Sequence, residues 1–191
     1  RAPESLLDTY ELERKPLARR NTAYARHFAD SVGLFKATPE LEQDGPAGEI
    51  ARQAASDHLN AHVRLEFNIP GVTFGGRYDG SPIVMSDGSS PPEDKPNAYQ
   101  PTACPGGRPP HAWLADGRSL YDTFNFEWTL LSLGERTPDT QAFERAAQSR
   151  GLDLQVIRHT APDLLALYEA PLVLIRPDQI VAWRGADATH A

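Results

Sequence analysis

With 191 residues, of which 40% are hydrophobic and 24% charged, the chain can form one globular domain with extra elements, or two small units. Its net charge of −7 argues against a general nucleic-acid binder, which needs a basic surface to displace counterions from phosphate. No apolar run approaches the roughly 20 residues that span a bilayer, and the charged N-terminal stretch is no secretory signal. A single cysteine, Cys104, excludes an internal disulfide framework, so we expect a cytoplasmic protein with no membrane or nucleic-acid partner. The first residue is Arg1 rather than Met, which favours a processed, cleaved or excised fragment.

Residues 4–65 have the periodicity of helices. The first helix meets Pro16, which either kinks it or begins a second helix. Gly33 is expected to end this helical stretch, and a further helix is expected after Gly45-Pro46. The apolar or small positions of the first stretch are Leu6, Leu7, Tyr10, Tyr24, Ala25, Phe28, Val32 and Phe35. Those of the later helix are Ile50, Ala51, Ala54, Leu59 and Leu65, before Pro70-Gly71.

Residues 71–110 are expected to form a connector. Its first part, residues 71–85, has β character with glycines that suggest bends; this character rests on Val72, Phe74, Tyr78, Ile83 and Val84. Seven of the twenty residues from Pro91 to Pro110 are proline, which excludes a helix or a central strand. The stretch is either an extended strap on the surface or a tether between units. We favour the strap, because Tyr99 and the turn at residues 104–107 can fix it in place.

The last part of the chain, residues 112–185, predicts a small α/β domain. Residues 128–133 form a buried strand, and residues 140–150 form a helix that Gly151 closes. A second strand over residues 152–157 and a short helix over residues 162–168 follow. Two apolar runs, 172–175 and 180–183, flank the turn 176–179 and form a hairpin. This order is typical of an α/β sandwich, whose commonest form is a thioredoxin-like sheet.

Four separated motifs resemble those of class A FAD-dependent aromatic hydroxylases, in the branch of the phenol, chlorophenol and hydroxyphenylpropionate monooxygenases. They cover nearly the whole chain in the family's order. The motifs are LLDTYELERKPLARRN (6–21), RYDGSPIV (77–84), GGRPPHAWLADGRSLYDTF (106–124) and PLVLIRPDQIVAWRG (171–185).

The resemblance implies an intact enzyme that binds FAD, takes a hydride from NAD(P)H and hydroxylates a phenolic ring. It implies that this chain is the C-terminal portion, which binds no cofactor alone, has a structural role and supports a homodimer. Residues 1–70 would be the helical tail of the flavin domain, 71–110 an extended connector, and 111–191 a thioredoxin-like domain without the redox CxxC pair. The missing flavin and substrate domain would be its main partner. The alternative is a stand-alone, redox-inactive thioredoxin-like interaction module.

The flavin-binding motifs of that family are absent from this sequence. No strand–GxGxxG–helix fingerprint occurs, and Gly71, Gly75 and Gly76 lie in the connector. The Asp-Gly pairs at 79–80, 87–88 and 116–117 are expected to be local turns. No catalytic, cofactor-binding or metal-ligating residue is therefore assigned to this chain.

Three other groupings suggest chemistry but have simpler explanations. Cys104 lacks the second thiol of a CxxC pair, so we expect a buried or incidental thiol. His58 and His62 follow Asp57 at metal-ligand spacing, yet no third ligand is near in sequence. His111 lies near Ser119, Asp116 and Asp122, which together suggest a hydrolytic triad, but Ser119 has no GxSxG elbow. We expect His111 and Arg108 to bond to the backbone instead, with a substrate-channel or interface role as the alternative.

The charged residues at the two ends of the chain are expected to be structural. The basic cluster of the first helix suggests a polyanion site, but i to i+4 pairing with acidic residues one or two turns earlier explains it better. The cluster is Arg14, Lys15, Arg19, Arg20 and Arg26, and the acidic residues are Glu4, Asp8, Glu11 and Glu13. Arg176, Asp178 and Arg184 are expected to staple the last hairpin, with a contact to the flavin domain as the functional alternative.

Overall fold

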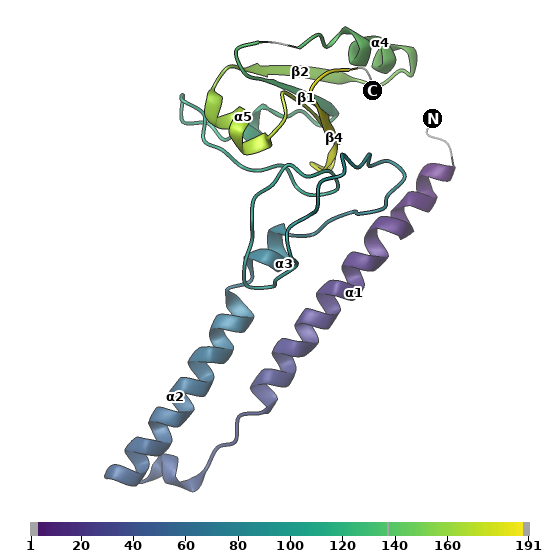
Figure 1. Ribbon diagram of the computed structural model, residues 1–191. Coiled ribbons are helices and arrows are strands. Elements are labelled where there is room, and N and C mark those ends of the chain that lie inside the picture. The colour runs from purple at the N-terminus through teal and green to yellow at the C-terminus, as the bar shows by residue number, and fades with distance from the viewer. Residues whose placement is uncertain (1–3, 137, 189–191) are drawn as a thin grey trace. The chain divides into compact units, whose positions relative to one another are not determined.

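The computed structural model of the protein describes residues 4–136 and 138–188 (Figure 1). The chain divides into two compact units. We call the first the α/β unit; it comprises Arg1–Arg14, Gly76–Glu93 and Gln100–Ala191. We call the second the helical unit; it comprises Lys15–Gly75 and Asp94–Tyr99. The proposed assignment of residues 1–70, 71–110 and 111–191 to parts of a larger enzyme stays a prediction.

The α/β unit is built on a four-stranded mixed sheet of order β2-β1-β3-β4. The strands are β1 Trp128–Leu133, β2 Leu154–His159, β3 Leu172–Ile175 and β4 Val181–Gly185. β1 pairs in parallel with β2 through the crossover helix α4, Gln141–Ser149, and antiparallel with β3. The short helix α5, Pro162–Tyr168, precedes β3, and β3 and β4 form an antiparallel hairpin. The predicted order of strands and helices is confirmed; β2 begins two residues later than expected.

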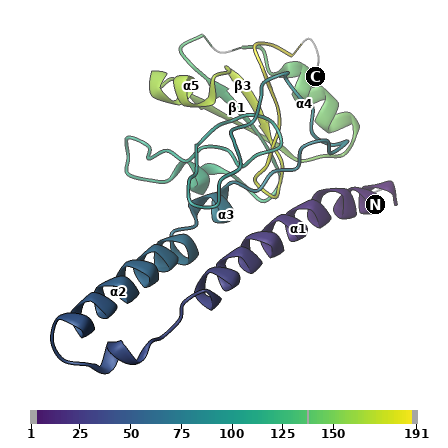
Figure 2. The ribbon, with the colours of Figure 1, turned by 60° about the horizontal axis from the view of Figure 1, so that its bottom comes forward.

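Helices α4 and α5 cover opposite faces of this sheet (Figure 2). Because successive strand residues point to opposite faces, β1 contributes Leu131 and Leu133 to one core and Leu130 to the other. The first core also contains Tyr168 of α5, and the second contains Phe143 of α4. The local helix signals acted as predicted: Pro162 begins α5, and Gly151, at φ +64°, follows the end of α4.

The proline-rich stretch packs on the sheet as a strap and covers the β4 edge, but residues 103–107, 109 and 110 are buried rather than lying on the surface as expected. The Gly106 N–H donates to the Val181 carbonyl at 2.8 Å, and the Val181 N–H donates to the Gly107 carbonyl at 2.9 Å. Residues 120–123 form the 3₁₀ helix η2, Leu120–Thr123, which Ser119 caps. Proline suits this position because an edge strap needs few backbone donors.

The helical unit contains most of α1, Ser5–Gly33, together with α2, Pro46–Phe67, and the short helices η1, Pro39–Glu42, and α3, Pro70–Phe74. α1 continues through Pro16 without ending and stops at Gly33, and α2 begins at Pro46 as predicted. The prediction of β character in residues 71–85 is wrong. Val72 and Phe74 lie in α3, and residues 75–85 contain no strand. The apolar residues there are too few to pair as strands, and Pro70 at the first helical position favours α3.

The strap also returns to the helical unit, where it closes the C-terminal end of α2. The Asn97 side-chain amide donates to the carbonyls of Leu65 and Asn68, and the Gly71 N–H donates to the Pro96 carbonyl. Gly71 is needed for this approach, because a Cβ there would lie 1.7 Å from the Lys95 carbonyl oxygen.

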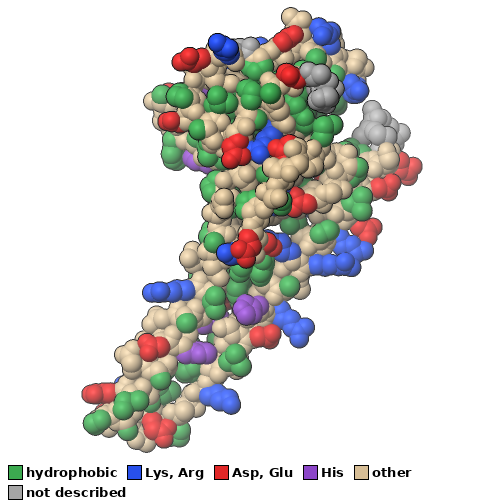
Figure 3. Space-filling view, in the orientation of Figure 1, with side chains coloured by type: hydrophobic (Ala, Val, Ile, Leu, Met, Phe, Trp, Pro, Cys, Tyr) green, Lys and Arg blue, Asp and Glu red, His purple; other side chains and the backbone are tan. Residues whose placement is uncertain are grey.

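Many apolar side chains of the two long helices face solvent. Ile50 is 72% exposed, and the predicted stripe of α2 is therefore not a closed core. Figure 3 shows hydrophobic side chains at the surface along these helices. The large exposed ones in α1 and α2 are Leu6, Leu7, Tyr10, Leu12, Val32, Ile50, Leu59, Val63 and Phe67, and Leu34 and Phe74 are exposed beyond these helices. None of the helices in the described part of the chain is long and apolar enough to cross a membrane.

Candidate functional site

The segment 106–124 folds around an aromatic and cationic cluster. The guanidinium of Arg108 lies 4.7 Å from the centroid of the Tyr121 ring and donates to its hydroxyl at 3.0 Å. The Tyr121 ring stacks on His111, and Trp113 meets the same imidazole edge-on at 4.9 Å between centroids. The Tyr121 hydroxyl donates to the Pro109 carbonyl. The cluster therefore ties the strap to η2.

The suggested hydrolytic triad is only half assembled. His111 Nε2 and Ser119 Oγ lie 2.9 Å apart, so these two residues do meet. Asp116 instead binds the Arg118 guanidinium at 2.7 Å, and Asp122 accepts from the Ser119 N–H. Among the described contacts, neither carboxylate reaches His111, and a base without an orienting acid is not a triad. These contacts of His111 and Arg108 join side chains, and the expected bonds of the two residues to the backbone stay a prediction.

A buried ion pair joins the first helix to the last hairpin inside the α/β unit. Arg176 donates to Glu13 Oε1 at 2.5 Å and to Oε2 at 3.0 Å, and the exposed fractions of these side chains are 8% and 5%. Ser81 also donates to Glu13, at 2.6 Å. Burial raises the pKa of Glu13, but the hydrogen bonds from Arg176 and Ser81 and the nearby positive charges outweigh it, so this pKa lies below its ordinary value.

The charged residues of the hairpin form two separate sets of ion pairs. Arg176 also binds Asp178 at 2.9 Å, which confirms that these two residues staple the turn. Arg184 instead pairs with Asp87 at 2.6 Å and with Glu169 at 2.8 Å, and so fixes the chain segments beside the sheet. The sequence could not reveal the Glu13–Arg176 contact, because the two residues lie 163 positions apart and Glu13 has cationic neighbours in its own helix.

Cys104 is a buried thiol, and the paired histidines contact other side chains. The Cys104 thiol is buried beside Arg77 and Ser89, as expected for a structural thiol. His62 is buried and lies 2.6 Å from Glu66, while His58 packs on the Phe35 ring. Over residues 4–136 and 138–188, no group of three or more His, Cys, Asp or Glu side chains is placed to hold a metal ion.

Two residues of the basic cluster of α1, Arg20 and Arg14, contact segments that are distant along the chain. Arg20 binds Asp94 of the strap at 2.6 Å and also donates to the Gly71 carbonyl. Arg14 lies 5.4 Å from the centroid of the Tyr78 ring. Arg26 lies 3.8 Å from Asp30 in an i to i+4 pair, but there the acidic residue follows the basic one, which is the reverse of the predicted order. The predicted explanation by local pairing is therefore wrong for Arg20 and for Glu13.

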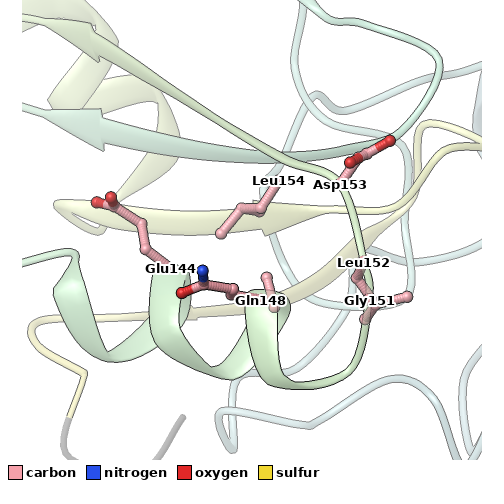
Figure 4. Close-up of a pocket in the computed structure, with 7 residues that line it drawn as sticks. Glu144, Gln148, Gly151, Leu152, Asp153 and Leu154 are labelled. Atoms are coloured by element: carbon pink, nitrogen blue, oxygen red, sulfur yellow. The ribbon is translucent and has the colours of Figure 1, made fainter.

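A hollow of about 440 Å³ lies between the end of α4 and the start of β2 (Figure 4). Glu144 and Asp153 line it, together with Gln148 and Leu154. Two carboxylates repel the pyrophosphate of a dinucleotide, so this hollow does not fit FAD. Gly80, Gly88 and Gly117 are turn residues at φ of +79° to +82°. The strap occupies the space next to Gly71.

Comparison with known proteins identifies the family. Residues 102–191 match the family model described as aromatic-ring hydroxylase, C-terminal. The chain is 30% identical over 220 residues to phenol 2-monooxygenase of a Pseudomonas species, covering 96% of this chain and 36% of that protein. It is 28% identical over 219 residues to 2,4-dichlorophenol 6-monooxygenase of Delftia acidovorans, covering 97% and 37%.

Solved structures agree with these relatives. The rebeccamycin biosynthetic enzyme RebC with reduced flavin is 38% identical, with a TM-score of 0.84, over 96% of this chain and 34% of that one. The flavin-dependent monooxygenase PieE in complex with FAD and substrate is 28% identical, with a TM-score of 0.77, over 97% and 38%. The chain therefore spans about a third of the length of the proteins it matches.

Proposed function

Because the chain belongs to the C-terminal part of the FAD-dependent aromatic-ring hydroxylases, we propose that it is the structural portion of a longer monooxygenase. The intact enzyme uses FAD and NAD(P)H to hydroxylate a phenolic ring, and FAD supplies the oxygen-activating chemistry. The relatives named for phenol and 2,4-dichlorophenol support this substrate class. The chain itself holds neither cofactor, and it works in the cytoplasm as part of a homodimer.

The observation that carries this proposal is the open apolar surface of α1 and α2. Nine large apolar side chains of these two helices are exposed, and exposed apolar surface of this extent indicates a face that another part of a protein covers. A flavin and substrate domain of the same polypeptide would cover them. In this proposal residues 1–70 complete the flavin domain, and residues 71–110 connect it to a thioredoxin-like domain over residues 111–191.

The strand order β2-β1-β3-β4, with only the β1–β2 pair parallel among neighbours, supports a thioredoxin-like sheet. The lone thiol of Cys104 is buried, so this domain acts through its surfaces rather than through redox exchange. The alternative of a stand-alone interaction module is disfavoured, because such a module gains nothing from a long helix with an apolar face open to water.

An intact mass and a visible absorption spectrum of the purified full-length protein test the proposal. A longer polypeptide with flavin bands, and NAD(P)H oxidation that increases when a phenol is added, is the expected result. The 191-residue chain expressed alone is the matched control and should be colourless. A full-length protein without flavin, or one that is indifferent to phenols, would reject the hydroxylase.

A further inference from the structure

The two edges of the sheet in the α/β unit differ in how far neighbouring backbone segments cover them. At the β4 edge, Gly106, Gly107 and Met85 exchange backbone hydrogen bonds with Val181 and Ala182. At the β2 edge no such cover is present among the described residues. Figure 1 shows β2 at the margin of the sheet. The residues of β2 are accordingly only half-buried or exposed, whereas all but the first of β1 are buried.

The pairing with β1 determines which backbone groups of β2 point outward. The Trp128 N–H donates to the Asp153 carbonyl, and the Gly134 N–H donates to the His159 carbonyl. Between these bonds, residues 155, 157 and 159 face β1, because backbone groups alternate along a strand. The N–H and C=O groups of Leu154, Val156 and Arg158 therefore point away from the sheet. An uncovered row of this kind is a template for pairing with another strand.

We propose that β2 pairs antiparallel with β2 of a second copy of this chain, about a two-fold axis at Val156, so that the two sheets become one. This inference deepens the proposed homodimer by naming its surface. Centred on Val156, the register sets Leu154 opposite Arg158 of the second copy, and all the outward N–H and C=O groups of both strands are paired. A register centred on Leu154 or Arg158 leaves part of them unpaired.

Side chains flanking the strand favour a second copy over an unrelated strand. Two acidic residues, Glu144 and Asp153, are among those that line the hollow beside Leu154 (Figure 4). Arg158 projects from the same face of the sheet as Leu154, since the two residues lie four apart on one strand. In the two-fold register, Arg158 of the second copy lies at the mouth of this acidic hollow. The contact occurs twice by symmetry, as an interface between identical surfaces requires.

Sedimentation of the full-length protein with Val156→Pro tests the pairing. Proline removes the N–H at the axis while leaving the bonds between β1 and β2 intact, because that N–H points outward. We expect the dimer dissociation constant to rise at least about tenfold. Val156→Thr keeps the N–H and the shape of the side chain, and should dimerise like the parent protein. Equal dissociation constants for all three proteins, or a monomeric parent protein, would overturn the proposal.

Cross-linking provides a readout that survives a folding defect. In the proposed register the two Val156 Cα atoms lie about 5.5 Å apart, within the usual span of a disulfide. Mild oxidation should therefore convert Val156→Cys to a covalent dimer. The two Leu154 Cα atoms lie roughly 14 Å apart along the strands, so Leu154→Cys should remain uncross-linked. Equal cross-linking of the two variants rejects the register, and the parent protein with its buried Cys104 gives the background.

The two proposals fail in different ways. A monomeric protein that binds flavin and oxidises NAD(P)H with a phenol would reject the β2 interface and keep the hydroxylase. A protein that cross-links through Val156→Cys but carries no flavin would keep the interface and reject the hydroxylase.

Discussion

The α/β unit and the helical unit use similar proportions of apolar residues in opposite ways. In the α/β unit, strands and helices enclose two cores, and side chains such as Leu130, Leu131 and Tyr168 are fully buried. In the helical unit, the long helices present Ile50, Val63 and Phe67 to solvent. The difference teaches that a sheet covered on both faces closes its own core, whereas a pair of long helices needs a further layer. The helical unit is therefore the part of the chain that depends on something outside it.

The largest expected effect comes from a core truncation in each unit. Leu131→Ala should lower the free energy of unfolding of the α/β unit by about 4 kcal/mol, through lost burial and a new cavity. Ile50→Ala in the helical unit should cost less than about 0.5 kcal/mol, because that side chain is 72% exposed. Urea unfolding of the 191-residue chain checks both, with fluorescence for the α/β unit, since all three tryptophans lie at positions 113, 128 and 183. Far-UV circular dichroism adds the signal of the helical unit. A similar cost for the two substitutions would abolish the contrast between the units.

A smaller effect is expected from the buried ion pair. Arg176→Met should cost about 3 kcal/mol, because it leaves the Glu13 carboxylate buried without its cation. Arg26→Met is the matched control: its pair with Asp30 is solvent-exposed and should contribute less than about 0.5 kcal/mol. The same urea titrations, followed by fluorescence and circular dichroism, give both values. If the two variants lose the same stability, the pair at Glu13 is no anchor for α1.

The smallest expected effect is the decrease in the free energy of unfolding at acid pH. Burial opposes the charge of Glu13, but its hydrogen bonds from Arg176 and Ser81 prevail; the hydrogen bond from Arg20 holds the pKa of Asp94 below its usual range. Both carboxyls thus bind protons less readily in the folded state, so their stabilisation is complete above their ordinary pKa values of 4.5 and 3.8. This stabilisation is lost as the pH falls below these ordinary pKa values and through the lower pKa values of the two carboxyls in the folded state.

Urea titrations over that acid range check this dependence unit by unit. Glu13→Gln should flatten the pH dependence seen by fluorescence, because Glu13 belongs to the α/β unit. Asp94→Asn should flatten only the dependence seen by circular dichroism, because Asp94 belongs to the helical unit. An unchanged acid profile in both variants would show that these carboxyls are not the groups that titrate.

Local signals were sufficient for most of the secondary structure. The apolar run of β1, Pro162 at the start of α5 and Gly151 after α4 act within a few residues, so their structural meaning can be inferred without the rest of the chain. Residues 71–85 show the opposite case. There a few aromatic and branched residues suggested strands, but Pro70 and the returning strap made Val72 and Phe74 part of a short helix.

The candidate sites depended on contacts that no local pattern contains. The sequence suggested Ser119, His111 and two aspartates as one group, and the fold brought together only the first two. The sequence suggested local partners for Glu13 and Arg20, whereas in the structure Glu13 pairs with Arg176 and Arg20 pairs with Asp94. A buried charge is stabilised by whichever opposite charge the fold places beside it, and chain distance does not enter.

The sequence by itself determined the α/β class of the last 80 residues, the helices of the first 67 and the family resemblance, because periodicity, turn residues and motifs are properties of short segments. Only the tertiary structure decided which edge of the sheet stays open, which helix faces remain uncovered and which charges are buried. Those features depend on which surfaces remain exposed to solvent after folding, and this exposure is set by the packing of segments that are distant in the sequence.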